Sequence, residues 1–265
     1  ITVTANNKTT DYTGSAISPN TVTVTAPTSG ATVKYGTASG TYNLTSPQTY
    51  TNAGTYTVYY QVTANNYTTK TGSYTLTINK IDPTHNVSGN SLTYSGSAQT
   101  LGTVTTNGGA VTYCATSGGT YSSTCPKQTN AGTYTTYYKI AESTNYNAYS
   151  GSFTTTIAQK ATTITLANQS TTFPTTKTYT FTSDGDGTFS ATSSDTNTAT
   201  VSISGKTLTL TPKKTGSVTI TVTHTAKSSG GNYTTASNTF TFTINAGTIT
   251  VTANNKTTDY TGSAI

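Results

Sequence analysis

The chain has 265 residues, a formal net charge of +6 and only 8% charged residues, where soluble domains typically carry about 25%. Arginine is absent, and Lys8, Lys34, Lys70, Lys139 and Lys177 stand singly, so we expect no nucleic-acid binding. No apolar run approaches the roughly 20 residues of a membrane-spanning helix, and we expect no membrane insertion in this segment.

Threonine is the most frequent residue, and the chain has 20 tyrosines. Both residue types favour β-strands. The tyrosines also supply apolar area that the low aliphatic content lacks. The composition therefore predicts an all-β chain rather than a disordered one.

The opening stretch, residues 1–17 (ITVTANNKTTDYTGSAI), returns letter for letter as residues 249–265, which is a period of 248 residues. We expect one period of a tandem array, followed at 248–265 by the first strands of the next repeat. Because an isolated hairpin is marginal in water, these strands should pair with the rest of an array or with a neighbouring copy.

Residues 1–80, here named repeat 1, contain an alternating segment that starts at Gly54. Large side chains occupy one face, at Tyr56, Val58, Tyr60 and Val62. A sheet with one apolar face needs a second sheet to cover it. The alternation therefore predicts a two-sheet sandwich.

Residues 81–160, named repeat 2, copy this pattern. The segment Asn-Ala-Gly-Thr-Tyr at 52–56 returns at 130–134, and Asn66-Tyr67 returns as Asn145-Tyr146. Residues 161–247, named repeat 3, are a diverged copy. We predict one module in each repeat, with joints so short that neighbouring modules are stiffly coupled.

The two cysteines of the chain, Cys114 and Cys125, lie on either side of a glycine-containing turn in repeat 2. If the turn closes a hairpin, their β-carbons can approach the roughly 4 Å that a disulfide needs. In an exported protein we expect this disulfide. Two free thiols are the alternative.

The segment Asn52–Val58 resembles the strand-entry motif of immunoglobulin-like sandwiches, in which a glycine makes a turn and a tyrosine hydroxyl braces the corner. Repeat 3 departs from it with Val218 at the tyrosine position. The resemblance implies structural corner residues at Gly54, Tyr56, Gly132, Tyr134 and Gly216. It implies no antibody-type disulfide, since Val58, Thr136 and Ile220 replace the usual cysteine.

Repeats 1 and 2 as a whole look like the bacterial MBG-type module. Repeat 3, with Ala199–Lys206 leading to Gly216–Ile220, is similar to the bacterial BIG-type immunoglobulin-like module. These resemblances imply a stalk or filament of a surface adhesin or fibrous extracellular protein, located outside the cell or on its surface. Its partners would be neighbouring copies of itself.

Catalytic chemistry needs clustered titratable groups, and the sequence has only seven acids and two histidines. We predict no enzyme, no catalytic residue, no metal site and no cofactor. Asp184-Gly185-Asp186-Gly187 lacks the remaining ligands of a calcium loop and is interpreted as a turn. His224 continues the inward phase of its strand and is interpreted as structural.

Tyr59 and Tyr137 fall on the outward phase of their strands. Aromatic side chains on a weakly charged surface favour association, so we predict that both are assembly contacts. An alternative function is an adhesin segment that binds glycan or a host protein through its own module faces.

Overall fold

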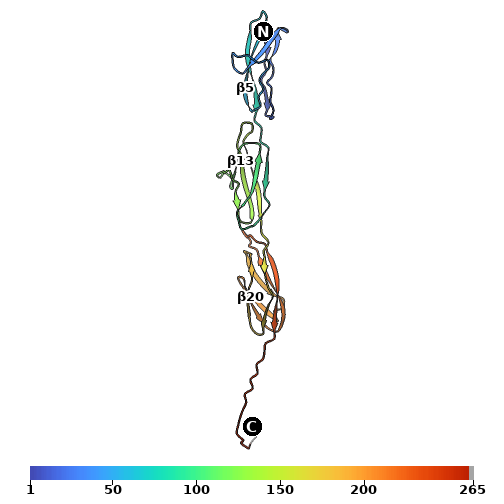
Figure 1. Cartoon of the computed structure of the whole chain (residues 1–265), viewed down its shortest axis with the longest axis vertical. Coiled ribbons are helices and arrows are strands. Elements are labelled where there is room, and N and C mark those ends of the chain that lie inside the picture. The colour runs from blue at the N-terminus through green and yellow to red at the C-terminus, as the bar shows by residue number, and fades with distance from the viewer. Residues whose placement is uncertain (263–265) are drawn as a thin grey trace. The chain divides into compact units, whose positions relative to one another are not determined.

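The computed structural model describes residues 1–262, and among these residues every regular element is a β-strand (Figure 1). Contacts divide the chain into two compact units, each described by itself. The first contains Ile1–Ser91, Ala98–Gln128 and Thr133–Thr156, and the second contains Leu92–Ser97, Thr129–Gly132 and the chain from Ile157 onward.

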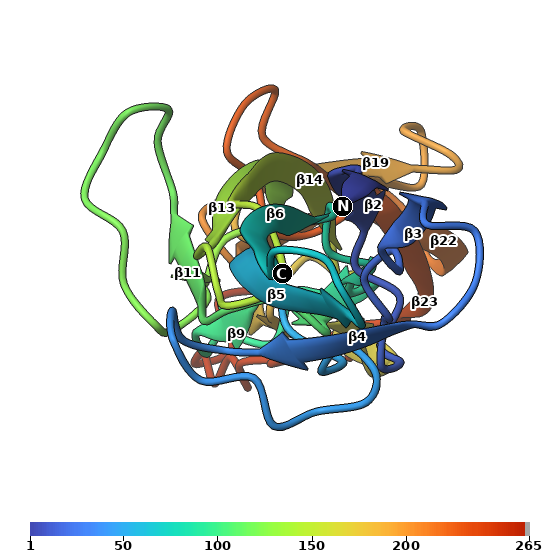
Figure 2. The same cartoon turned by 90° about the horizontal axis from the view of Figure 1, so that it is seen from above.

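Repeat 1 lies in the first unit. Its strands are β1 (Thr2–Thr4), β2 (Lys8–Asp11), β3 (Thr23–Ala26), β4 (Ala31–Gly36), β5 (Gly54–Ala64) and β6 (Lys70–Asn79). One sheet has the order β2-β6-β5-β4, whose labels can be followed in Figure 2, and β1 pairs with β3. Val58, Tyr60 and Val62 of β5 are buried as the alternation predicts, while Thr55 and Thr57 are exposed.

Tyrosines fill this core because their hydroxyls find partners there. Tyr35 is buried, and its hydroxyl accepts a hydrogen bond of 2.9 Å from the N–H of Val22. Buried Tyr74 donates to the carbonyl of Asn20. Since a buried phenol needs a hydrogen-bond partner, these bonds allow tyrosine to replace the scarce aliphatic residues.

Repeat 2 supplies the rest of the first unit. Its strands there are β7 (His85–Gly89), β9 (Gln99–Thr100), β10 (Gly102–Thr106), β11 (Val111–Cys114), β12 (Lys127–Gln128), β13 (Gly132–Ile140) and β14 (Tyr149–Ala158). Strands β11, β13 and β14 are neighbours in one sheet, while β7 pairs with β10 and β9 with β12. The loop after β11 stands away from the strands (Figure 2).

The second unit contains β8 (Leu92–Thr93), which pairs in parallel with the end of β14. Its other strands are β15 (Ile164–Thr165), β16 (Gln169–Thr172), β17 (Lys177–Thr180), β18 (Thr182–Ser183), β19 (Thr188–Ser193), β20 (Ala199–Ser204), β21 (Thr207–Pro212), β22 (Gly216–Thr225) and β23 (Ala236–Asn245).

Two sheets of this unit, β16-β23-β22-β19 and β17-β21-β20, contribute to one buried core. Fully buried members come from β21, β22 and β23 and are Leu208, Leu210, Ile220, Val222 and Phe242. Two sheets around one apolar core form the sandwich that the alternation predicts. The predicted fold class, all-β with tandem immunoglobulin-like sandwiches, is confirmed.

The predicted module boundaries at 1–80, 81–160, 161–247 and 248–265 stay a prediction. The two compact units divide the chain within residues 81–160 and do not test the three-module division.

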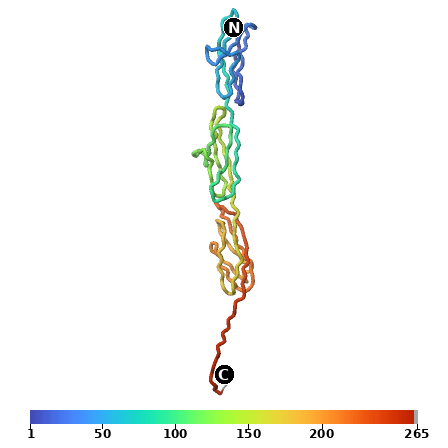
Figure 3. Tube along the Cα trace, in the orientation of Figure 1, coloured from blue at the N-terminus to red at the C-terminus, as the bar shows by residue number. Residues whose placement is uncertain are grey.

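The copy of the opening stretch differs in structure from the original. Residues 1–14 contain β1 and β2, whereas residues 249–262, with the same letters, form no strand. Ile249, Val251 and Tyr260 are more than four-fifths exposed, and Figure 3 shows the trace running on after β23. In repeat 1, β1 pairs with β3 and β2 pairs with β6, whereas residues 249–262 make no such pairing.

Candidate functional site

The turn that begins β5 is held by the tyrosine that follows it. The hydroxyl of Tyr56 donates a hydrogen bond of 2.8 Å to the carbonyl of Asn52. Its ring stacks on Tyr50 with centroids 3.8 Å apart and an interplanar angle of 17°. This is the hydrogen bond expected of a corner tyrosine, and it fixes the residues just before β5. Tyr134 is half-buried at the equivalent position.

The corner glycines share one backbone conformation. Gly54 has φ of 156°, Gly132 has 155° and Gly216 has 135°. Residues with a β-carbon rarely adopt these values. The three turns are therefore equivalent in geometry, including the one in repeat 3, which lacks the tyrosine.

Asn145 of repeat 2 binds the turn of repeat 1 within the first unit. Its side-chain oxygen accepts a hydrogen bond of 2.8 Å from the N–H of Ala53, and its NH₂ group donates one of 3.2 Å to the side-chain oxygen of Asn52. One carboxamide thus uses its donor and its acceptor on two adjacent residues.

The backbone of the connecting segment binds the same asparagine. The N–H of Ile81 donates to the carbonyl of Asn145 at 3.2 Å, and the N–H of Asn147 donates to the carbonyl of Ile81 at 2.8 Å. Ile81 and Tyr146 form an isolated parallel bridge. The connector is therefore ordered by backbone hydrogen bonds to the repeat that follows it.

Tyr146 adds an aromatic contact to this joint. Its ring lies edge to face with Tyr12, with centroids 5.7 Å apart and an angle of 78°. The N–H of Tyr12 donates to the carbonyl of Asn79 at 2.9 Å, directly after the parallel pairing of β2 with β6. This pairing places Tyr12 at the end of repeat 1 where Tyr146 meets it.

A second joint with the same contacts lies within the second unit. The side-chain oxygen of Asn232 accepts the N–H of Ala131 at 2.8 Å, and its NH₂ group donates to the side-chain oxygen of Asn130 at 3.4 Å. Tyr233 lies edge to face with Tyr94, with centroids 5.4 Å apart and an angle of 72°. Asn232 and Tyr233 of repeat 3 therefore make the same contacts as Asn145 and Tyr146 of repeat 2.

The backbone hydrogen bonds of the connecting segment are also found at the second joint. The N–H of Lys160 donates to the carbonyl of Asn232, and the N–H of Thr234 donates to the carbonyl of Lys160, both at 2.9 Å. The ammonium of Lys160 lies 3.2 Å from a carboxylate oxygen of Asp184 and 5.7 Å from the ring centroid of Tyr233. Ile81 and Lys160 are thus equivalent, since Ile81 lies two residues past β6 and Lys160 two residues past β14.

The Asp184–Gly187 segment connects β18 to β19, as interpreted from the sequence, and supports the second joint. Burial alone would raise the pKa of Asp184. Hydrogen bonds from the N–H of Thr163, at 2.7 Å, and from Lys160 outweigh burial and lower this pKa below its ordinary value. Asp186 accepts the N–H of Asn232 at 2.8 Å. The two carboxylates therefore orient the connector and the docking asparagine.

His224 lies beneath this segment and is fully buried. Its Nε2 accepts the N–H of Gly187 at 2.8 Å, and its Nδ1 lies 3.0 Å from the carbonyl of Thr234. A β-carbon on Gly185 would stand 2.6 Å from the imidazole ring. Packing against a structural histidine therefore requires glycine at position 185, and at position 187 a β-carbon would also meet the backbone carbonyl of Thr225 at 2.0 Å.

The hydrogen bonds and ring contacts described at the joints do not involve the two predicted assembly residues. Tyr59 and Tyr137 are half-buried on β5 and β13. Their role in assembly stays a prediction. Among the described residues, the more exposed tyrosines are Tyr67, Tyr149 and Tyr260.

Cys114 and Cys125 are free thiols in the structure. The Sγ of Cys114 donates to the carbonyl of Thr116 at 3.1 Å, and burial raises the pKa of Cys125. Both residues line one surface cavity of about 440 Å³. The disulfide stays a prediction. Its two cysteines lie beside the same cavity.

The docking role of the Asn-Tyr pairs was missed from the sequence. Asn66-Tyr67 and Asn145-Tyr146 marked the repeats there and received no function. The available signal was that this dipeptide persists in repeat 3, where most of the pattern has diverged. Its partners lie 92 and 101 residues away, a separation that local pattern does not reveal.

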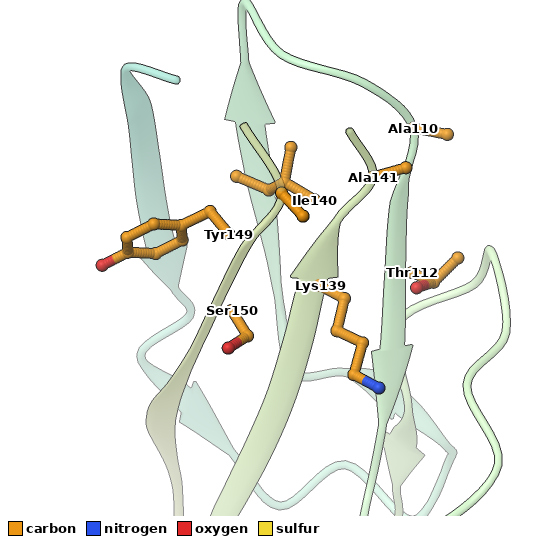
Figure 4. A pocket seen from close by; sticks show the side chains of 8 residues that line it. Ala110, Thr112, Lys139, Ile140, Ala141, Tyr149 and Ser150 are labelled. Carbon is orange, nitrogen blue, oxygen red and sulfur yellow. The ribbon is translucent and has the colours of Figure 1, made fainter. Parts of the chain in front are cut away.

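The first unit also has a mainly apolar pocket of about 420 Å³ on repeat 2. Figure 4 shows Lys139 and Tyr149, which come from the neighbouring strands β13 and β14. Tyr149 is 38% exposed. The ammonium of Lys139 lies 4.3 Å from the ring centroid of Tyr121. A pocket lined by an exposed aromatic ring and a lysine is one way to bind a polar ligand.

Within residues 1–262, no group of three or more histidine, cysteine or acidic side chains is placed to hold a metal ion. The same part of the chain contains no helix long and apolar enough to cross a membrane.

No protein-family model matches this sequence, and a search of curated proteins finds no significant relative. The resemblance to MBG-type and BIG-type modules therefore stays a prediction.

Alignments to several solved structures extend over most of the chain, with TM-scores below 0.5. Extracellular domains 1–3 of Drosophila N-cadherin align at 12% identity and a TM-score of 0.35, covering 92% of this chain and 98% of that one. Domains 1–6 of the surface layer protein SbsC align at 16% and 0.32, covering 94% and 40%. Cadherin domains 1–5 of protocadherin gamma B2 align at 11% and 0.31, covering 93% and 59%. At these scores the roles of those proteins are not transferred to this chain.

Proposed function

We propose that this chain is a structural segment of a protein outside the cell or on its surface, in which consecutive repeats dock end to end to form a stalk or filament. The observation that supports this most directly is the duplicated joint. Asn145 and Asn232 make the same two side-chain hydrogen bonds to the preceding repeat, at 2.8 Å in both cases for the backbone donor.

The joints have the strength that a stiff spacer needs. Each combines two carboxamide bonds, two backbone bonds and an edge-to-face aromatic pair, together about 3 kcal/mol after allowance for solvent. That corresponds to roughly a hundredfold preference for the docked arrangement. Because a short connector joins the repeats covalently, docking loses less entropy than the association of separate chains would.

Nitrogen-15 relaxation of the full chain tests this function. In the wild type, amides of β5 and β13 should report one rotational diffusion tensor. Replacing Asn145 and Tyr146 together with alanine should release repeat 1 from repeat 2, so that the two sets of amides report different tensors. Asn43→Ala, at an exposed position of repeat 1, is the control and should leave the tensor unchanged. Independent tumbling of the two repeats in the wild type would contradict a spacer role.

Catalysis is not part of the proposed function. The few titratable side chains mostly serve structural contacts, as Asp184, Asp186 and His224 do at the second joint. We therefore propose no reaction and no cofactor.

A second candidate function is binding of a glycan or host protein through a module face. The observation that favours it is the exposed Tyr149 beside the 420 Å³ pocket. A glycan array probed with the wild type and with Tyr149→Ala decides this. Binding that is lost in the variant supports the adhesin function, and a blank array for the wild type excludes glycans from it.

A further inference from the structure

We infer that the end of repeat 3 is a docking surface for a second copy of repeat 1. Asn66 and Tyr67 of that second copy would make the contacts. The inference rests on the proposed function, since it extends the joint seen twice in the structure to the boundary between periods. It identifies the residues on both sides of that boundary.

Asn66 and Tyr67 are the one Asn-Tyr pair of the three repeats that is exposed. Asn145, Tyr146, Asn232 and Tyr233 are half-buried in their joints, whereas Asn66 is exposed and Tyr67 is 52% exposed. This exposure is the state expected of an Asn-Tyr pair that no preceding repeat covers.

The receiving surface is also recognisable in repeat 3. The N–H of Phe173 donates to the carbonyl of Asn245 at 2.9 Å, directly after the parallel pairing of β16 with β23. Tyr12 and Tyr94 hold the same place relative to β6 and β14. Those two rings are half-buried against the following tyrosine, while Phe173 is 37% exposed.

The connector position also recurs at the same spacing from the preceding strand. Ile81 and Lys160 lie two residues beyond β6 and β14, and Gly247 lies two residues beyond β23. Ile81 and Lys160 each bind the backbone on both sides of the docking tyrosine. Gly247 therefore offers the N–H and carbonyl that would clamp Asn66 and Thr68 of the next copy.

The turn of repeat 3 retains one of the two groups that bind the docking asparagine at the other joints. Counted back from the corner glycine, Thr215 replaces Ala53 and Ala131, and it retains the backbone N–H that the docking carboxamide accepts. Lys214 replaces Asn52 and Asn130 and has no side-chain acceptor. Thr215 and Lys214 are exposed. The boundary between periods would therefore have one side-chain hydrogen bond fewer than the two joints within a period.

The sequence points to the occupant. Residues 249–265 repeat residues 1–17 exactly, so the stretch after repeat 3 has the opening sequence of repeat 1, and we infer a second copy of repeat 1 as the occupant. The copy of Tyr12 is Tyr260, which is 92% exposed here.

Amide exchange of a two-period chain, residues 1–248 followed by 1–265, tests the inference. The N–H of Thr215 in the first period should exchange about tenfold more slowly than in the one-period chain. Asn66→Ala in the second copy alone should remove that protection. Thr215 protection that appears in the one-period chain only at high concentration would also support the surface, with the second copy then supplied by another chain.

The amides of Ala53 and Ala131 separate this inference from the proposed function. If they are protected and Thr215 exchanges equally fast in both chains, the inference is overturned and the spacer role stands. If Asn145→Ala and Asn232→Ala leave the exchange of Ala53 and Ala131 unchanged, the joint itself is wrong and both proposals fail.

A gain of protection provides a second, independent readout. Lys214→Asn in the first period restores the missing acceptor, so Thr215 should exchange more slowly still, by about threefold to tenfold. The matched control is Lys213→Asn, a neighbouring exposed lysine, which should have no effect. Equal rates in the two variants would show that Lys214 does not face Asn66.

Discussion

Asn145 accepts a hydrogen bond of 2.8 Å from the backbone N–H of Ala53, a residue 92 positions earlier in the chain. The N–H of Ala53 precedes β5 and has no partner in the strand ladder. A backbone donor of this kind needs a partner when it is partly buried. The asparagine of the following repeat supplies it, so the end of one repeat is completed by the next.

Removing the two partners of this joint should have unequal effects. Asn145→Ala deletes both side-chain bonds and should lower the free energy of unfolding by about 1–2 kcal/mol. Asn52→Ala deletes only the 3.2 Å bond and should cost about 0.5 kcal/mol. Urea titration of the full chain measures both. A larger loss for Asn52→Ala than for Asn145→Ala would contradict the assigned geometry.

Thr136→Val should stabilise the protein. Thr136 is fully buried, and its hydroxyl has no hydrogen-bond partner. Its counterpart in repeat 1 is Val58, also buried. Removing an unsatisfied buried hydroxyl without changing the shape should gain about 1 kcal/mol. Thermal unfolding checks this, with Thr135→Ala on the exposed face of the same strand as the control. A lower midpoint for Thr136→Val would show that the hydroxyl is satisfied in solution.

Gly216→Ala should destabilise the protein through the backbone alone. The φ of Gly216 is 135°, and an added β-carbon would meet its nearest neighbour, Thr198 Cγ2, at an ordinary 3.6 Å. The loss of about 1–3 kcal/mol therefore reflects backbone strain. Urea unfolding should show this loss for Gly216→Ala and little change for Thr219→Ala, an exposed position on the same strand. Equal midpoints for the two variants would mean that the turn relaxes.

Asp184 should make stability depend on pH in the acid range. Its pKa is lower in the folded protein than in the unfolded chain, where it is about 3.9. Its contribution is therefore complete above about pH 4 and is lost as the pH falls through the lower folded value. Asp184→Asn should reduce the difference in urea midpoint between pH 7 and pH 3. Asp259→Asn, in the exposed segment after β23, is the control.

The two cysteines should form an intramolecular disulfide under mild oxidation. They line one cavity, and the raised pKa of Cys125 means that the reaction should accelerate as the pH rises, because the thiolate is the reacting species. Intact mass should fall by two hydrogens, and Cys125→Ser should abolish that loss. Two thiols that remain titratable after oxidation would show that the loop does not bring them together.

The sequence by itself determined the strand phases. Alternation in β5 and β22 predicted which side chains are buried, because a strand places successive side chains on opposite faces whatever it pairs with. Gly54, Gly132 and Gly216, which the resemblance implied as corner residues, have a positive φ that excludes most other residues. These properties depend on neighbours a few positions away.

Only the tertiary structure decided the role of the Asn-Tyr pairs and the state of the repeated ends. Residues 1–14 and 249–262 have the same letters, yet the first form β1 and β2 and the second form no strand. A strand and a docking carboxamide each need donors and acceptors from distant residues, and local pattern does not encode which distant residues are present. The same chemistry, hydrogen bonding to a partner far along the chain, therefore determines both where strands form and where repeats join.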